Sequence, residues 1–241
     1  MTNRIAMWSG PRNISTAMMR SWENRSDTEV VDEPFYAFYL DQTRSPHPCF
    51  EDVLQSQSNN YEHVVYELTK DACNSRLQYQ KHMTHHMLAG IDLSWTRELQ
   101  HCFLIRDPAQ VVNSYTNSRG VCSAEDIGIQ RQFELYQDIT QISGQDIPII
   151  DSNDVLKAPE KMLKLLCEKL DIAFTTAMLK WPKGSRISDG VWAKHWYKNV
   201  DNSVGFAPYS PKNLRLNDEQ LSVVHQVQPF YQQLYKNRIN A

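Results

Sequence analysis

Short apolar runs that alternate with amphipathic helical segments constrain the fold of this chain more than any other feature. One apolar run covers residues 5–8 and stops at a Ser-Gly-Pro turn, after which apolar residues recur at helical spacing over 14–22. A second run, 101–105, stops at Arg-Asp-Pro, which is typical of a helix start, so a helix is expected over 109–115. This alternation predicts a mainly parallel central sheet with helices on both faces, an α/β three-layer sandwich.

Other segments extend the same pattern along the chain. Residues 29–31 and 63–68 are predicted as strands, because they are short, rich in valine and bounded by polar residues. The run 147–150 is a further strand candidate, and Pro159 opens an apolar-faced helix after it. A polar helix is expected near the C-terminus, over 217–236.

Size, charge and cysteine content limit the class of protein. With 241 residues and no internal repeat, the chain is expected to form a single domain over 1–241. A net charge of −3 argues against nucleic acid or an acidic membrane as a partner. Five scattered cysteines without a C-x-x-C pair indicate free thiols in a reducing compartment. Because no signal peptide or long apolar stretch is present, a cytoplasmic protein is expected.

The first turn from strand to helix, Ser9–Thr16, has the composition of an anion-binding loop. A flexible Gly, Arg12 and the hydroxyls of Ser15 and Thr16 lie close to a helix N-terminus, where they can donate hydrogen bonds to a phosphate or sulfate. A simple helix N-cap would also explain the Ser and Asn of this loop. The loop is not a Walker A sequence, because the second Gly and the Lys of G-x-x-x-x-G-K-[ST] are absent.

This loop resembles the 5′-phosphosulfate-binding loop of sulfotransferases, usually written P-K-S-G-T-T-W. Pro11 matches the Pro and Arg12 matches the Lys. Ser15 and Thr16 match the hydroxyl pair, whereas Asn13 and the residue after it replace Ser and Gly. The resemblance implies that the loop binds the donor 3′-phosphoadenosine 5′-phosphosulfate (PAPS) and that Arg12 assists the transfer of its sulfuryl group.

Two later segments are similar to other parts of the same family. Arg106 is followed by Asp and Pro and precedes Ser114 by eight residues, as in the family's 3′-phosphate site. Lys183 and Gly184 precede a G-V-W-A-K-H-W segment, which is similar to the loop R-K-G…G-D-W-K-N-H-F that covers the nucleotide. The resemblance implies that all four residues bind the 3′-phosphate. An ordinary ion pair of Arg106, and simple packing of the later stretch, are the structural alternatives.

Two kinds of side chain compete for the role of general base. Glu33 follows a predicted strand, 21 residues after Arg12, where glycan-modifying sulfotransferases place a catalytic Glu. His82, His85 and His86 lie where many cytosolic sulfotransferases have a K-T-H-L segment that supplies the base. The resemblance slightly favours His85 or His86. Glu33 could equally be a structural strand end, and the histidines could simply be packed; no metal site is expected from them.

The resemblance therefore implies a PAPS-dependent sulfotransferase that acts on a hydroxyl or amine of a small-molecule acceptor. Two alternatives stay open: a non-catalytic module that binds PAPS or its product PAP, and a phosphotransferase using ATP and Mg²⁺. The phosphotransferase would place Ser15 or Thr16 and the carboxylate of Asp151 on the metal. Neither the acceptor nor the oligomeric state follows from the sequence. Several aromatic residues suggest an aromatic-lined acceptor pocket: Tyr36, Phe38, Tyr39, Trp95 and Trp192.

Overall fold

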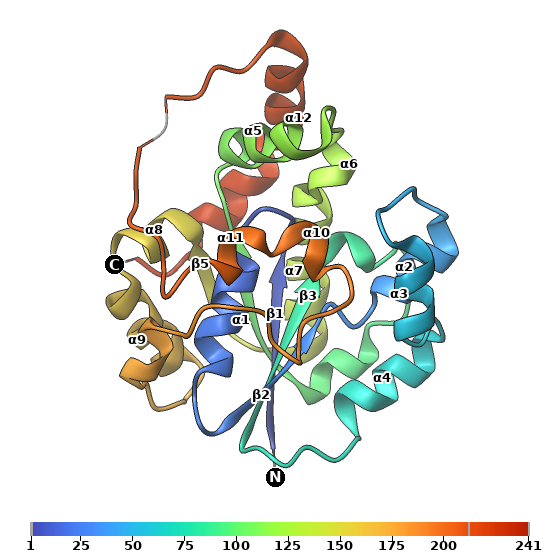
Figure 1. Ribbon diagram of the computed structural model, residues 1–241, viewed down its shortest axis with the longest axis vertical. Helices are drawn as coiled ribbons and strands as arrows, with labels where there is room; N and C mark the ends of the chain where they lie inside the picture. Colours follow the sequence, from blue (N-terminus) through green and yellow to red (C-terminus); the bar gives the residue numbers. More distant parts are fainter. Residues whose placement is uncertain (1, 212, 241) are drawn as a thin grey trace.

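Parallel strands form the centre of the computed structural model, which describes residues 2–211 and 213–240 (Figure 1). In this part of the chain five strands pair in the order β2-β3-β1-β4-β5, and each pair is parallel. The predicted mainly parallel α/β sheet is therefore confirmed. The strands are β1 (Asn3–Ser9), β2 (Thr28–Asp32), β3 (Leu77–Met83), β4 (Gln100–Ile105) and β5 (Ile149–Asp151).

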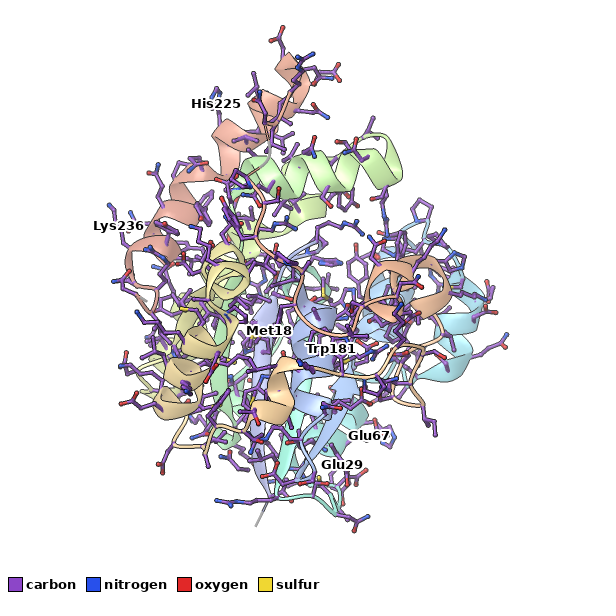
Figure 2. The ribbon with its side chains drawn as sticks, turned by 60° about the vertical axis from the view of Figure 1, so that its left-hand side comes forward. Met18, Glu29, Glu67, Trp181, His225 and Lys236 are labelled. Carbon is purple, nitrogen blue, oxygen red and sulfur yellow. The ribbon has the colours of Figure 1, made fainter. Side chains whose placement is uncertain are left out.

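Helices cover both faces of the sheet, because successive side chains of a strand point to opposite sides. In β1, Ile5 and Met7 belong to one apolar core, and Ala6 and Trp8 belong to the other. The first core includes α1 (Ser15–Glu23) and α9 (Pro159–Lys169). The second includes α4 (Tyr61–Thr69), α5 (Pro108–Arg119), α7 (Ile129–Ser143) and α12 (Asp218–Lys236). Figure 2 shows Met18 of α1 close to the sheet, whereas His225 and Lys236 of α12 lie at the periphery. The other described helices are α2 (Tyr36–Thr43), α3 (Phe50–Ser56), α6 (Ala124–Ile127), α8 (Ser152–Lys157), α10 (Ala193–Trp196) and α11 (Lys198–Asp201). Short 3₁₀ helices lie at η1 (Thr84–His86), η2 (Ser94–Glu98) and η3 (Thr176–Leu179).

Local capping explains where α5 and α12 begin. Asp107 caps α5 by accepting a hydrogen bond from the backbone N–H of Gln110, and the first residue of the helix is Pro108. Asn217 and Gln220 form a capping box at the start of α12. The sequence-predicted helices at these places are confirmed. Among the described helices, none combines the length and the apolar character that crossing a membrane requires.

The strand order places one crevice in the molecule. β1 and β4 are neighbours, and the chain continues from β1 to β2 on one side of this pair but from β4 to β5 on the other side. In open α/β sheets, such a switch point leaves a crevice beyond the carboxyl ends of the strands. The loop between β1 and α1, the end of β3 and the start of α5 all meet there.

One predicted strand is wrong, and the strand that replaces it is polar. Residues 63–68 lie in the helix α4, where Val64 and Leu68 share one buried face at a spacing of four residues. β3 instead has the sequence LQYQKHM, and every residue of it is buried. Several of its polar side chains form hydrogen bonds inside the protein; Gln80, for example, donates to the carbonyl oxygen of Leu68 over 2.8 Å. Such a strand contains no continuous apolar run, which is why the sequence analysis missed it.

Candidate active site

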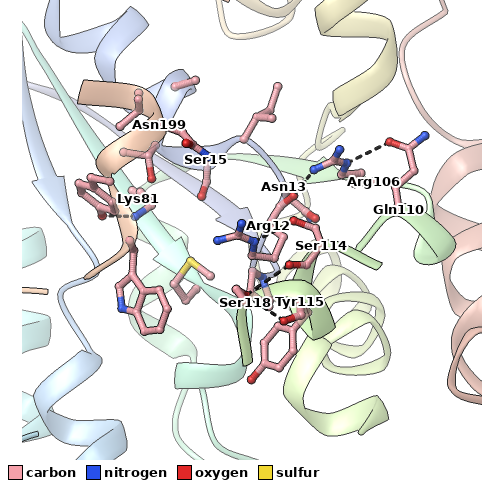
Figure 3. A pocket seen from close by; sticks show the side chains of 18 of the residues that line it. Arg12, Asn13, Ser15, Lys81, Arg106, Gln110, Ser114, Tyr115, Ser118 and Asn199 are labelled. Carbon is pink, nitrogen blue, oxygen red and sulfur yellow. Dashed lines mark hydrogen bonds between the residues drawn. The ribbon is translucent and has the colours of Figure 1, made fainter. Parts of the chain in front are cut away.

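A cavity of about 490 Å³ lies beyond the carboxyl ends of the strands (Figure 3). Its walls come from the loop before α1, the ends of β2 and β3, the helix α5, and the segment that follows α10. The structure brings together in this lining ten of the site residues expected from the sequence: Pro11, Arg12, Asn13, Ser15, Thr16, Glu33, His85, His86, Arg106 and Ser114.

The loop between β1 and α1 has an unusual backbone. Arg12 and Ile14 have positive φ angles of 64° and 59°, which is strained for a β-branched residue such as Ile. Asn13 anchors the loop, because its side-chain amide donates to the carbonyl of Leu104 over 3.1 Å and its carbonyl accepts from Ser152 over 3.1 Å. Ile14 is the N-cap of α1 and offers no side-chain hydrogen bond to the first N–H groups of the helix. These N–H groups are therefore free to bind an anion.

Two arginines approach each other beside Ser114 (Figure 3). The Nε of Arg12 donates to the Oγ of Ser114 over 3.0 Å, and Nη1 of Arg106 donates to the carbonyl of Arg12 over 2.5 Å. Neither guanidinium forms an ion pair with a carboxylate of the described residues. Burial lowers the pKa of Arg12, and so does nearby Arg119; burial and the charge of Arg12 lower the pKa of Arg106. A bound polyanion would stabilise both cations.

A buried lysine connects the ends of β2 and β3. Nζ of Lys81 donates to Oδ1 of Asp32 over 2.8 Å, to Oε1 of Glu33 over 2.6 Å and to the hydroxyl of Tyr197 over 2.6 Å. The Tyr197 hydroxyl in turn donates to Oδ2 of Asp32 over 2.7 Å. Burial alone would lower the pKa of Lys81, but the two carboxylates outweigh it and hold that pKa well above its ordinary value. One lysine charge therefore faces two carboxylates.

Glu33 is the more accessible of these carboxylates. Asp32 also accepts hydrogen bonds from Tyr197 and from the backbone N–H of Gly190, over 3.2 Å for the latter. The side chain of Glu33 accepts a hydrogen bond from Nζ of Lys81, and its side chain is 11% exposed against 1% for Asp32. Burial, and the negative charge of Asp32, raise the pKa of Glu33 above its ordinary value. Glu33 has a φ of 45° and lines the cavity, so a strained backbone presents a carboxylate of raised basicity there.

The two histidines pack beside Glu33 in an aromatic wall. The ring of His86 is stacked between the rings of Tyr36 and Tyr39, with centroid distances of 4.6 and 4.9 Å. Its Nε2 lies 4.0 Å from Oε2 of Glu33. Burial lowers the pKa of His85 to about 3 and holds that of His86 well below its ordinary value. Both imidazoles are therefore neutral near pH 7, and a base with a pKa of about 3 accepts a proton poorly.

Other expected residues lie outside the cavity. Lys183 and Gly184 are not brought to its lining; the backbone N–H of Gly184 instead donates to the carbonyl of Asp201 over 2.8 Å. Of the expected aromatic residues, Tyr36 and Tyr39 line the cavity. The others, Phe38, Trp95 and Trp192, are buried core residues. Residues 205–210 line the cavity without having been expected there. Within 2–211 and 213–240, no three His, Cys, Asp or Glu side chains are grouped to hold a metal ion.

The sequence analysis also missed Lys81, Tyr197 and Arg119. Lys81 precedes candidate histidines, and its segment contains no apolar run that would predict a strand. The signal that could have found it is the alternation of Leu77 and Tyr79 with polar residues, followed by a lysine near a strand end. Tyr197 belongs to an irregular segment whose path cannot be read from periodicity.

Comparisons with known proteins agree with this architecture. A family model described as "Sulfotransferase domain" matches residues 3–238. Branched-chain-amino-acid aminotransferase-like protein 1 of Arabidopsis thaliana is 36% identical over 208 residues, which are 86% of this chain and 37% of that protein. The chain thus spans little more than a third of the length of this curated relative.

Solved structures show the same fold at low sequence identity. A sulfotransferase from Alicyclobacillus acidocaldarius superimposes with a TM-score of 0.58 at 8% identity, over 100% of this chain and 98% of that one. A mouse sulfotransferase complexed with PAP superimposes with a TM-score of 0.50 at 13% identity, over 97% and 87% of the two chains.

Proposed function

Because the chain belongs to the sulfotransferase domain family, we propose that it transfers a sulfuryl group from PAPS to a hydroxyl or amine of a small-molecule acceptor. The observation that carries this proposal is the pair Arg12 and Arg106 beside Ser114, at the N-terminus of α1 and without carboxylate partners among the described residues. PAPS carries anionic groups at both its 5′ and 3′ positions, so it requires two such cations. The mouse neighbour that contains PAP supports a nucleotide of this kind.

The two ends of the donor would bind different parts of the cavity. The phosphosulfate would bind the N–H groups at the start of α1 together with Arg12. The 3′-phosphate would bind Arg106 and Ser114. The Oγ of Ser114 accepts a hydrogen bond from Nε of Arg12, so its own proton is left to donate to a phosphate oxygen.

Sulfuryl transfer in this cavity would be a single displacement at sulfur. The acceptor oxygen or nitrogen forms a bond to sulfur, the bond from sulfur to the 5′-phosphate oxygen breaks, and PAP leaves with the electron pair of that bond. The acceptor's proton passes to Glu33, whose raised pKa suits a general base better than the depressed values of His85 and His86. Arg12 stabilises the negative charge that develops on the oxygens around sulfur.

The donor assignment predicts that PAP stabilises the protein more than AMP does. AMP lacks the 3′-phosphate, so it cannot use Arg106 and Ser114. At a hundredfold excess over Kd, a ligand adds about 2.7 kcal/mol to the free energy of unfolding. We expect a larger thermal shift with PAP than with AMP, and the loss of this difference in Arg106→Ala.

The matched control is Arg215→Ala, which replaces an exposed arginine outside the cavity and should keep the full difference. Equal shifts with PAP and AMP in the wild type would contradict the 3′-phosphate site. Consumption of ATP with Mg²⁺ instead of PAPS would indicate a phosphotransferase. Tight PAP binding without PAPS turnover on any acceptor would indicate a binding module.

The geometry gives the phosphotransferase little support. It requires the carboxylate of Asp151 on the metal, but Asp151 is buried and does not line the cavity. Its carboxylate caps α8 through the N–H of Asn153 over 2.8 Å and accepts from the hydroxyl of Tyr231 over 3.0 Å. These contacts make Asp151 a structural residue at the end of β5.

The assignment of the base predicts the pH dependence of the chemical step. With Glu33 as base, the single-turnover rate at saturating PAPS should rise with pH as Glu33 loses its proton, with the acid limb above the ordinary pKa of a glutamate. With His85 as base the limb would lie near pH 3, because burial lowers the pKa of His85 to about 3. Glu33→Gln should abolish the step, and His85→Asn should retain most of it.

Glu67→Gln is the control, because Glu67 lies exposed on α4 (Figure 2). A rate that stays flat from pH 5 to 8 and survives Glu33→Gln would return the role to the histidines. His86→Asn distinguishes the second histidine, which packs on Tyr36 and Tyr39.

A further inference from the structure

The helix α5 carries cavity-lining residues along most of its length. Gln110 lies near its first turn beside Arg106, Ser114 lies in the middle, and Arg119 is its last residue. Each helical residue advances about 1.5 Å, so Gln110 and Arg119 are separated by about 14 Å along the axis. Arg119 therefore lies at the opposite end of α5 from Arg106, about 7.5 Å along the axis beyond Ser114.

Arg119 lies among aromatic rings rather than carboxylates. Its guanidinium carbon lies 4.5 Å from the ring centroid of Trp196 and 5.4 Å from that of Tyr115. Its Nη1 donates to Nε2 of His47 over 3.2 Å. No carboxylate of the described residues forms an ion pair with it. Because a guanidinium has five N–H donors, most of its hydrogen-bonding capacity is unused.

The other charged groups that line the cavity already have partners or roles. Lys81 is held by Asp32 and Glu33. The carboxylate of Asp126 accepts from the backbone N–H of Ser123 over 2.8 Å, within the capping box of α6. Arg12 and Arg106 are assigned to the donor in the proposed function. Of the described cations that line the cavity, Arg119 alone has neither a carboxylate partner nor an assigned role in binding the donor.

The contact with His47 also orients a second donor. Burial, and the charge of Arg119, lower the pKa of His47 to about 4, so the imidazole is neutral near pH 7. Since Nε2 accepts from Arg119, the proton of the ring must lie on Nδ1, which is 2.5 Å from the hydroxyl oxygen of Tyr36. His47 then donates to Tyr36, and the hydroxyl proton of Tyr36 is left to donate into the cavity.

We propose that Arg119 binds an anionic group of the acceptor, so that the substrates are hydroxyl or amine compounds that also carry a carboxylate. The stacked rings of Tyr36, Tyr39 and His86 provide a flat apolar wall for the rest of the acceptor. The phosphosulfate of the donor is the other anion that could reach Arg119. This inference rests on the proposed function, because it takes Arg12 and Arg106 as occupied by PAPS.

The test measures binding of matched ligands in the presence of saturating PAP. The probes are 3-(4-hydroxyphenyl)propionate with its amide, and 6-hydroxyhexanoate with its amide, titrated by calorimetry. We expect at least one carboxylate to bind about tenfold or more tightly than its amide, as a charge-assisted hydrogen bond contributes. Arg119→Met should abolish this preference, and Arg119→Lys should retain part of it. Arg215→Met, at an exposed position outside the cavity, should leave it unchanged.

The inference would be overturned by equal binding of acid and amide, by absence of binding by both acids, or by a preference that survives in Arg119→Met. PAP is titrated alone into each variant as well. If Arg119→Met weakens PAP as strongly as Arg106→Ala does, Arg119 serves the donor and the inference fails. If the wild type does not bind PAP, the donor proposal fails instead, and the same acid preference is then required of the nucleotide-free protein.

Discussion

Replacing Lys81 by methionine is expected to lower the free energy of unfolding by about 3–5 kcal/mol, because it removes one partner of a buried ion pair. Lys81 is 1% exposed and contacts both Asp32 and Glu33, so the variant would bury two carboxylates without their cation. Chemical denaturation at pH 7 measures the effect. The loss should shrink as the pH is lowered, because protonation of the carboxylates removes the unpaired charge.

The control is Lys161→Met, at an exposed position of α9, where a change within about 0.5 kcal/mol is expected. The double variant Asp32→Asn with Lys81→Met should recover part of the loss, because it removes one of the two stranded charges. A loss below about 1 kcal/mol in Lys81→Met would show that the three charges are not coupled as the hydrogen bonds indicate.

The second large effect is expected at Arg12. Arg12→Gln should lower the single-turnover rate at saturating PAPS by about 10²- to 10³-fold, the loss typical of one preorganised donor to a developing negative charge. The Kd for PAP should change much less, because PAP no longer carries the sulfuryl group. The unfolding midpoint should be nearly unchanged, because the hydrogen bond to Ser114 is the one side-chain hydrogen bond of Arg12 to the described residues.

An unchanged rate in Arg12→Gln would reduce the loop to a helix cap that also binds nucleotide. Arg12→Lys separates charge from geometry: it keeps the positive charge and loses the paired N–H donors. An intermediate rate is expected for that variant.

The strands and helices that are bounded by turn residues such as Gly, Pro and Asp could be predicted from the sequence. The Ser-Gly-Pro turn after β1 and the Asp-Pro pair before α5 each separate an apolar run from a helix, so both strand-to-helix units were predicted correctly. Parallel strands bring their carboxyl ends together, which is why Arg12 and Arg106 could be expected in one place. Their contact through Ser114 and the loop carbonyl required the structure.

The segments that were predicted wrongly lack turn residues that would separate a strand from a helix. The HVVYEL stretch fits both periods, and the helix is decided by the cap from Asn60 and by burial of Val64 and Leu68. Lys183 and Gly184 were assigned to the 3′-phosphate site from the similarity of a short sequence motif alone. The backbone of Gly184, with a φ of 108°, turns its N–H toward Asp201. No local pattern encodes that turn.

The hydrogen bond from Tyr197 to Asp32 joins residues 165 positions apart in the chain. Ribosomes add about 5–20 residues per second, so on the order of ten seconds or more separates the synthesis of the two partners. Once residue 81 has been added, the nascent chain contains the lysine and both carboxylates but still lacks the phenol that closes the cluster. The wall formed by residues 205–210 emerges later still. Ribosome-bound chains should therefore gain the sheet before they gain a cavity able to hold nucleotide.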